Sequence, residues 1–289
     1  MVFLGLLTAG VTAAAEDNPK VAVLVNHEPT GWSSGSGGTD GSLELVKCNL
    51  EVYSAAIATA ASQGAKLLIL PESYGLWGPQ HKSGYWEPLS NATRPCTEAD
   101  PNGHPAQHAM GCLAEQHGIA LAYNIFSRRA SANRITELVV SEEGRLLASY
   151  DKVHLAPIIE PRAGVTKGTN RPTSFEWRGR RWGIIICAEG VFPWTPGGNW
   201  DQMDALHRQN ATNWLWSVGG MVPVAHVARA FAKRYGVRVA TSQDATLDAP
   251  GVLICGGKEA LDCPWEDHPV SRLPQGYTAA PFVRIAKLE

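Results

Sequence analysis

Short, continuously apolar runs alternate with longer alanine-rich or amphipathic segments along most of this chain. Such runs are typical of buried strands, whereas apolar positions spaced three and four residues apart indicate helices. We predict strands at 20–26, 65–70, 119–126, 135–141, 145–150, 173–177, 181–187, 211–218 and 237–242, and helices at 43–63, about 105–117 and 223–235. Gly64, Gly118 and Gly236 follow the three helices, where glycine commonly ends a helix.

The order of these elements predicts the fold class. Residues 142–144 and the pair Arg178-Gly179 join neighbouring strands as hairpin turns, while other strands alternate with helices. We therefore expect an α/β protein with mixed sheets covered by helices. No linker divides the chain, so residues 16–289 are predicted to form a single domain.

The composition favours a ligand that binds in a pocket over a partner that binds to a charged surface. The chain has 289 residues, with 44% hydrophobic and 18% charged positions, as in ordinary globular proteins. Its 25 basic and 27 acidic residues nearly cancel, which argues against nucleic acid as a partner. A small-molecule substrate is expected, and the oligomeric state stays open.

The first fifteen residues have the pattern of a secretory signal peptide. "MVFLGLLTAGVTAAAED" contains an apolar run that ends in Ala13-Ala14-Ala15, which suits cleavage before Glu16, although a basic start is missing. The alternative is a short apolar tail. We expect no other segment of the chain to span a bilayer.

Four of the six cysteines are spaced as two disulfides. Cys96 and Cys112 flank a loop and part of a helix, and Cys255 and Cys263 enclose a glycine-rich loop. Cys48 lies in a helical pattern and is expected to be a small buried residue. Disulfides favour an oxidising compartment.

Two Asn-Ala-Thr sequences, at Asn91 and Asn210, are possible acceptors for N-glycosylation. Together with the cysteines, they favour a secreted protein or one in the lumen of the endomembrane system. A cytoplasmic location is the alternative.

Three of the predicted strands end in a residue that can do chemistry. "LLILPE" leads to Glu72, "LLASYDK" to Lys152 and "GIIIC" to Cys187. Each alone has an ordinary explanation, because a strand cysteine usually packs in the core and a strand-end charge is usually solvated. Functional groups nevertheless collect in the loops at strand ends, and three such residues on three strands favour an active site.

These three side chains are sufficient for attack on an amide or nitrile carbon. Cys187 would supply the nucleophile and Glu72 would take its proton, because a free thiol is mostly protonated at neutral pH. Lys152 and the backbone N–H of Ala188 would stabilise the oxyanion. Glu72 would then activate the water that hydrolyses the thioester.

Glu72, Lys152 and Cys187, in this order at the ends of apolar strands, resemble the Glu-Lys-Cys triad of the nitrilase, or carbon-nitrogen hydrolase, superfamily. The resemblance covers about residues 20 to 245. It implies a four-layer α-β-β-α sandwich and hydrolysis of a linear amide without metal or organic cofactor. It also implies that Glu160 matches the second glutamate of the superfamily, which positions the lysine and the substrate.

Within the superfamily, the chain most resembles the branch of biotinidase and the vanins, which are pantetheinases. "CNLEVYSAAIATAASQGAKLLILPE" is similar to the first helix and strand of that branch, and "GRLLASYDKVHL" to its lysine segment. Cys96 and Cys112 are similar to its loop cysteines. The chain departs from the branch at Ala188-Glu189-Gly190, which predicts one smaller pocket wall, and at "NWLWSVGG".

Other kinds of site have weaker support. No papain-type cysteine signature surrounds Cys187, and His226 is expected to be exposed. His104 and His108 have a spacing compatible with a metal, but no HExxH motif is present. Trp194 is expected in the core or in a pocket lining. The alternatives in function are another amidase or nitrilase of the superfamily, or an inactive binding member.

Overall fold

The computed structural model describes residues 18–27, 43–72, 85–169, 171–219, 224–244, 251–256, 259–274, 277 and 280–287. The predicted leader, residues 1–15, and the predicted loop, residues 32–42, lie outside these ranges, as does the side chain of Cys48. Among the helices in these ranges, none is both long and apolar enough to cross a membrane.

Thirteen strands and seven α-helices make up the described structure. The strands are β1 (Lys20–His27), β2 (Leu67–Ile69), β3 (Glu87–Pro88), β4 (Ala120–Arg129), β5 (Ala132–Val140), β6 (Leu146–Asp151), β7 (Ser174–Trp177), β8 (Arg180–Ile186), β9 (Asn213–Val218), β10 (Arg238–Asp244), β11 (Leu253–Ile254), β12 (Trp265–Pro269) and β13 (Phe282–Lys287). The helices are α1 (Leu43–Ser62), α2 (Pro95–Glu98), α3 (Pro105–His117), α4 (Ile159–Arg162), α5 (Ala188–Val191), α6 (Asp201–Arg208) and α7 (Val224–Tyr235). One 3₁₀ turn, η1, spans Phe192–Trp194.

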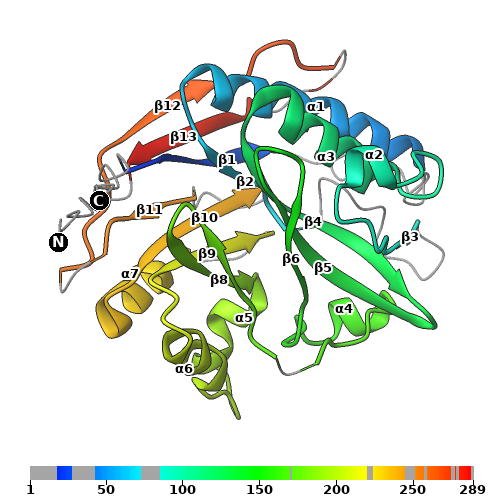
Figure 1. The fold of residues 1–289 in the computed structure, drawn as a ribbon. Coiled ribbons are helices and arrows are strands. Elements are labelled where there is room, and N and C mark those ends of the chain that lie inside the picture. The colour runs from blue at the N-terminus through cyan, green and yellow to red at the C-terminus, as the bar shows by residue number, and fades with distance from the viewer. Residues whose placement is uncertain are drawn as a thin grey trace, which may run out of the picture.

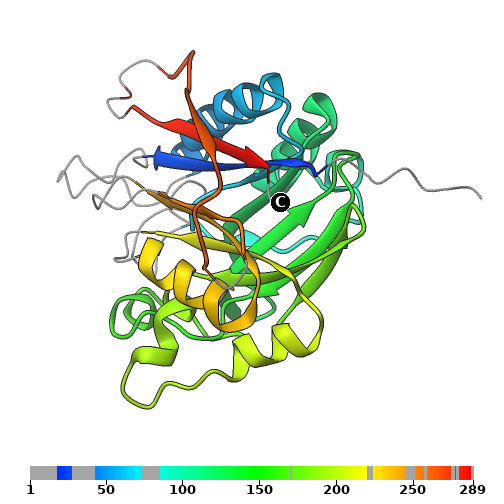
Figure 2. The same cartoon turned by 90° about the vertical axis from the view of Figure 1, so that its left-hand side faces the viewer.

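The strands form one hydrogen-bonded sheet in two halves. Its order is β6-β5-β4-β2-β1-β10-β9-β8-β7, and β1 joins the halves by pairing in parallel with β10. β13 also pairs with β1, antiparallel, and carries β12 on its other side. α1 and α3 lie on one side of the strands, and α6 and α7 lie on the opposite side (Figures 1 and 2).

Alternate residues of β1 enter two different hydrophobic cores. Ala22 and Leu24 pack in a cluster with residues of α1 and α3. Val21 and Val23 belong to a second cluster, which contains residues of β8, β9 and α7. This alternation is expected for a strand that is covered on both faces. The α-β-β-α layers predicted from the sequence are therefore confirmed, although the two β layers share one continuous sheet.

The structure confirms the nine predicted strands and three predicted helices, with shifts of a few residues at their ends. Gly64, Gly118 and Gly236 each have a positive φ at the end of a helix, as expected. The sequence analysis did not predict β3, β11, β12, β13 or the shorter helices.

The two predicted disulfides, Cys96–Cys112 and Cys255–Cys263, are present. The first connects α2 to α3, and the second closes a loop after β11.

Candidate active site

The structure brings the three strand-end residues into one buried cluster. The Nζ atom of Lys152 lies 2.6 Å from Oε1 of Glu72 and 2.5 Å from Oε1 of Glu160. Lys152 is only 1% exposed, so its ammonium is enclosed by these groups rather than by water. An ammonium has three hydrogens to donate, and these two carboxylates use two of them.

Glu160 reaches Lys152 because the chain turns back directly after β6. The residue lies in the single turn of α4, and its second oxygen accepts the backbone N–H of Ala156 at 2.8 Å. Ile158, just before the turn, has a φ of 73°, which is unusual for a β-branched residue. The loop is thus held by the same carboxylate that contacts the lysine.

Cys187 occupies a strained position between β8 and α5. Its φ is 39° and its ψ is −108°, outside the regions that non-glycine residues normally adopt. Its N–H donates to the carbonyl of Ser217 at 2.8 Å, and its own carbonyl accepts the indole N–H of Trp216 at 3.0 Å. The thiol lies 3.4 Å from the carbonyl oxygen of Gly219. The sharp turn is therefore fixed by hydrogen bonds to two residues of β9.

The charges in the cluster shift one another's ionisation. Burial raises the pKa of Glu72 to about 7, with Lys152 opposing this change and Glu160 adding to it. Burial and the carboxylate of Glu72 raise the pKa of Cys187 well above its usual range, although Lys152 acts against them. Burial opposes the charge of Lys152, but Glu72, Cys187 and Glu160 together raise the pKa of Lys152 well above its usual value. At neutral pH the site therefore holds a thiol beside a group that can accept its proton.

Ala188 begins the short helix α5 immediately after the cysteine. The first N–H groups of a helix have no acceptor within that helix. The backbone N–H of Ala188 is therefore available next to the thiol.

Glu189, in the segment Ala188-Glu189-Gly190 where the chain departs from the branch, is held by hydrogen bonds inside the protein. Its side chain is fully buried and its carboxylate accepts five hydrogen bonds. The donors are the hydroxyl of Tyr150 (2.7 Å), the N–H groups of Val153 (2.7 Å), His154 (3.4 Å) and Ile186 (2.9 Å), and the amide of Gln202 (3.0 Å). Gly190 packs against Trp216 so closely that a Cβ atom would collide with the indole ring. The sequence analysis missed the contacts of Glu189, and the one signal for them was a carboxylate only two residues after the apolar strand that ends in Cys187.

A further buried carboxyl, Glu137 of β5, is connected to the cysteine through β9. The hydroxyl of Ser217 donates to Glu137 at 3.0 Å, while the carbonyl of Ser217 accepts the N–H of Cys187. Burial raises the pKa of Glu137 well above its usual value. Glu137 is thus a buried carboxyl whose contact with Ser217 reaches the strand that holds the Cys187 backbone.

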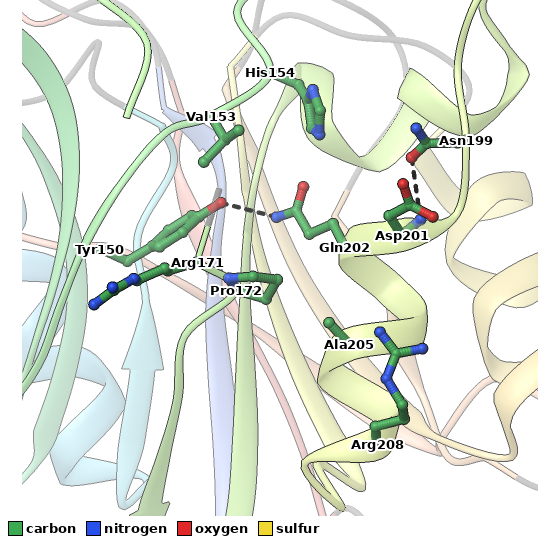
Figure 3. Close-up of a pocket in the computed structure, with 10 residues that line it drawn as sticks. All are labelled: Tyr150, Val153, His154, Arg171, Pro172, Asn199, Asp201, Gln202, Ala205 and Arg208. Carbon is green, nitrogen blue, oxygen red and sulfur yellow. Dashed lines mark hydrogen bonds between the residues drawn. The ribbon is translucent and has the colours of Figure 1, made fainter. Parts of the chain in front are cut away.

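A cavity of about 330 Å³ adjoins this network on the side of α6. Its lining includes Tyr150 and Gln202, whose side chains point toward each other and are hydrogen-bonded at 2.9 Å (Figure 3). Val153, the neighbour of Lys152, also lines it, whereas Lys152 and Cys187 do not. The cavity thus touches the groups that hold Glu189 rather than the reactive atoms.

The remaining candidates from the sequence lie outside the cluster. His104 precedes α3 and its Nδ1 lies 2.8 Å from the carbonyl of Pro88, while Nδ1 of His108 lies 3.2 Å from that of Ala99. His226 is exposed, as predicted. Trp194 does not lie in the core, because its side chain is 49% exposed, with ring contacts to Trp200 and to Phe231 of α7. Within the described ranges, no cluster of three His, Cys, Asp or Glu residues could hold a metal ion.

The comparison with protein families agrees with this arrangement. The model of the family "Carbon-nitrogen hydrolase" matches residues 43–196, which is more than half of the chain. The chain therefore belongs to the carbon-nitrogen hydrolase family. The matched range includes Glu72, Lys152, Glu160 and Cys187.

Curated relatives from mammals are about 30% identical to this chain over the segments that match. It is 29% identical over 175 residues to human pantetheine hydrolase VNN2, a match that covers 54% of this chain and 33% of the relative. It is 30% identical over 132 residues to the pantetheinase of Sus scrofa, covering 39% of this chain and 26% of the relative. The chain thus matches about a third or less of the length of these relatives.

Solved structures of an amidase from Nesterenkonia sp. AN1 have the same fold. One, with acrylamide added to its active-site cysteine, superposes with a TM-score of 0.65 at 20% identity and covers 94% of this chain and 93% of the amidase. A Cys-to-Ala variant in complex with butyramide also gives a TM-score of 0.65, at 21% identity, and covers 94% and 91%. The nitrilase-type fold is therefore shared across nearly the whole chain.

Proposed function

We propose that this protein hydrolyses a linear amide bond through a thioester on Cys187. The observation that carries the proposal is the buried contact of Lys152 with both Glu72 and Glu160, beside a strained cysteine at the end of β8. Membership of the carbon-nitrogen hydrolase family supports it. The adduct on the active-site cysteine of the Nesterenkonia amidase supports a cysteine nucleophile in this fold.

The first half of the reaction forms the thioester. Glu72 takes the proton of the Cys187 thiol as sulfur attacks the carbonyl carbon of the amide. The third hydrogen of the Lys152 ammonium and the N–H of Ala188 stabilise the oxyanion of the tetrahedral intermediate. The C–N bond then breaks, and Glu72 returns the proton to the leaving amine.

The second half releases the acid. Glu72 accepts a proton from a water molecule, whose oxygen attacks the thioester carbon. The C–S bond breaks, the proton passes to sulfur, and a carboxylic acid leaves the site. A pKa of about 7 suits Glu72 to both roles, because general acid–base catalysis is most efficient when the pKa is near the working pH.

We propose a pantetheine-like or biotin-like amide as the first substrate to test. The support is the similarity to mammalian pantetheinases, which is distant and covers part of those proteins. A simple aliphatic amide is the second candidate, because the fold matches an amidase whose Cys-to-Ala variant has been described in complex with butyramide.

We further propose that the protein works outside the cytoplasm. Two disulfides are compatible with an oxidising compartment. Asn91 and Asn210 both lie on exposed positions, where an acceptor for N-glycosylation must lie. Expression in a secreting eukaryotic cell, followed by enzymatic deglycosylation, tests this proposal, and a protein retained in the cytoplasm with free thiols would contradict it.

A substrate panel tests the activity. Purified wild type and Cys187→Ala are incubated with pantetheine, biocytin and butyramide, and the released amine is measured. We expect turnover of at least one amide by the wild type and none by the variant. Equal, negligible rates for both proteins on all three amides would overturn the proposed activity.

A further inference from the structure

The carboxylate of Glu189 connects the two chain segments that carry Lys152 and Cys187. On one side, Oε1 accepts the hydroxyl of Tyr150 and the N–H of Val153, both at 2.7 Å, and these residues flank Lys152 in the sequence. On the other side, Oε2 accepts the N–H of Ile186 at 2.9 Å, one residue before the cysteine. The segments lie more than thirty residues apart in the sequence, so this contact joins parts of the chain that local structure does not.

A carboxylate suits this position better than an amide of the same shape. All five partners of Glu189 donate a hydrogen to it, and an ionised carboxylate accepts at both oxygens. An amide at the same place would direct its NH₂ group at the donors of one side. A buried donor that faces another donor loses its hydrogen bond and pays its full desolvation penalty. One of the two segments would then move away.

The geometry points to Glu189 as a positioning residue, which sets the distance between the oxyanion-stabilising ammonium of Lys152 and the thiol of Cys187. This inference rests on the proposed function. Glu189 itself touches neither reactive atom, because its partners are Tyr150, His154, Gln202 and the backbone on either side. A small displacement of a reacting group is enough to slow an enzyme by about a hundredfold.

Tyr150 and Gln202 hold the carboxylate from the side of the cavity. The amide of Gln202 donates both to the hydroxyl of Tyr150 and to Oε2 of Glu189, at 2.9 and 3.0 Å. The hydroxyl of Tyr150 donates in turn to Oε1. The three side chains form a closed ring of hydrogen bonds, which fixes the rotamer of Glu189 (Figure 3 shows the contact between Tyr150 and Gln202).

The chain offers a matched control in Glu87. This carboxylate is also buried, and it accepts the N–H groups of Ala106 and Gln107 and the side-chain amide of Gln107. It stabilises the first turn of α3 and has no contact with the cluster around Lys152. Glu87→Gln therefore removes a buried carboxylate of similar surroundings without changing the active site.

The experiment compares wild type, Glu189→Gln and Glu87→Gln by three measurements. These are the thermal unfolding temperature, the rate at which iodoacetamide alkylates Cys187 between pH 6 and 10, and kcat and KM for whichever amide the wild type accepts. We expect Glu189→Gln to lower kcat by about a hundredfold with KM changed less than about threefold. We also expect its alkylation profile to shift along the pH axis, because Lys152 no longer faces the thiol as before.

Glu87→Gln should lower the unfolding temperature but keep the kcat and the alkylation profile of the wild type. The inference is overturned if Glu189→Gln keeps both the kcat and the profile, or if Glu87→Gln changes them equally. If Glu189→Gln does not fold, Tyr150→Phe replaces it, since this change removes one donor and keeps the other four. An unchanged profile in folded Tyr150→Phe would then overturn the inference.

Failure of the proposed function would give a different set of results in these measurements. In that case the wild type turns over no amide, while the alkylation profiles of Glu189→Gln and Glu87→Gln still differ from each other. The alkylation reports the surroundings of Cys187 without any substrate, so it tests the positioning by itself.

Discussion

Glu72 and Glu87 are both almost completely buried, at 3% and 2% exposure, but their partners differ in kind. Glu87 accepts two backbone N–H groups and one neutral amide at the start of α3. Glu72 instead contacts the ammonium of Lys152 and forms a hydrogen bond with the thiol of Cys187. Burial raises the pKa of both carboxyls. A raised pKa therefore does not distinguish them, whereas a neighbour that can exchange a proton does.

The largest contrast is expected from replacing each of these glutamates by glutamine. Glu72→Gln should reduce kcat by a factor of about 100 to 10,000, because it removes the group that accepts the thiol proton. Glu87→Gln should leave kcat unchanged and lower the free energy of unfolding by about 1–3 kcal/mol, because a buried donor loses its acceptor. Steady-state kinetics and urea unfolding of both variants measure these effects. Equal kcat values for Glu72→Gln and the wild type would remove the proposed base.

A second expected effect concerns Lys152, the cation that contacts Glu72 but not Glu87. Lys152→Met leaves the buried carboxylates of Glu72 and Glu160 without their partner, which should cost about 3–5 kcal/mol of unfolding free energy. Adding Glu160→Gln to this variant should recover part of the stability but none of the activity. The unfolding free energies of the single and double variants, measured in urea, check this. Recovery of activity in the double variant would contradict the role of Lys152 as oxyanion stabiliser.

The smallest effect is a dependence of stability on pH. The pKa of Glu72 rises from 4.5 to about 7 on folding, so the folded protein holds this proton where the unfolded chain has lost it. The protonation of Glu72 therefore adds most to the free energy of unfolding below pH 4.5. This contribution is lost as the pH rises to about 7. The side-chain amide in Glu72→Gln does not titrate. The free energy of unfolding of this variant, relative to that of the wild type, should therefore increase over this pH range by about 3 kcal/mol at most and stay constant above it.

Urea unfolding of wild type and Glu72→Gln from pH 4 to pH 8 measures this difference. A difference between the two proteins that stays the same at every pH would show that Glu72 is not perturbed by the fold.

The parts of the fold that the sequence predicted are those with strong local signals. The buried stretches 21–25 of β1 and 182–186 of β8 carry no polar side chain because both faces of these strands are covered, and glycines mark the ends of α1, α3 and α7. Glu72, Lys152 and Cys187 could be predicted because each lies within two residues of the end of a predicted strand. That these three side chains lie close together was predicted from the family resemblance and from the rule that functional groups collect where strands of a sheet end.

The missed elements depend on contacts that are distant in the sequence. β12 is mostly exposed and has no apolar run, and it exists because β13 pairs with it and with β1. α6 buries few side chains over two turns, too short a pattern to stand out. The role of Glu189 was hidden for the same reason, since its partners Tyr150 and Val153 come from another strand end.

The central claim is that Cys187 carries the acyl group of the substrate during turnover. The most direct measurement is intact-mass spectrometry after incubation with an accepted amide and a rapid acid quench, followed by peptide mapping. We predict a mass increase equal to the acyl group on the peptide that contains Cys187, and none in Cys187→Ala. Turnover by the wild type without an adduct on this peptide, together with equal turnover by Cys187→Ala, would contradict the account.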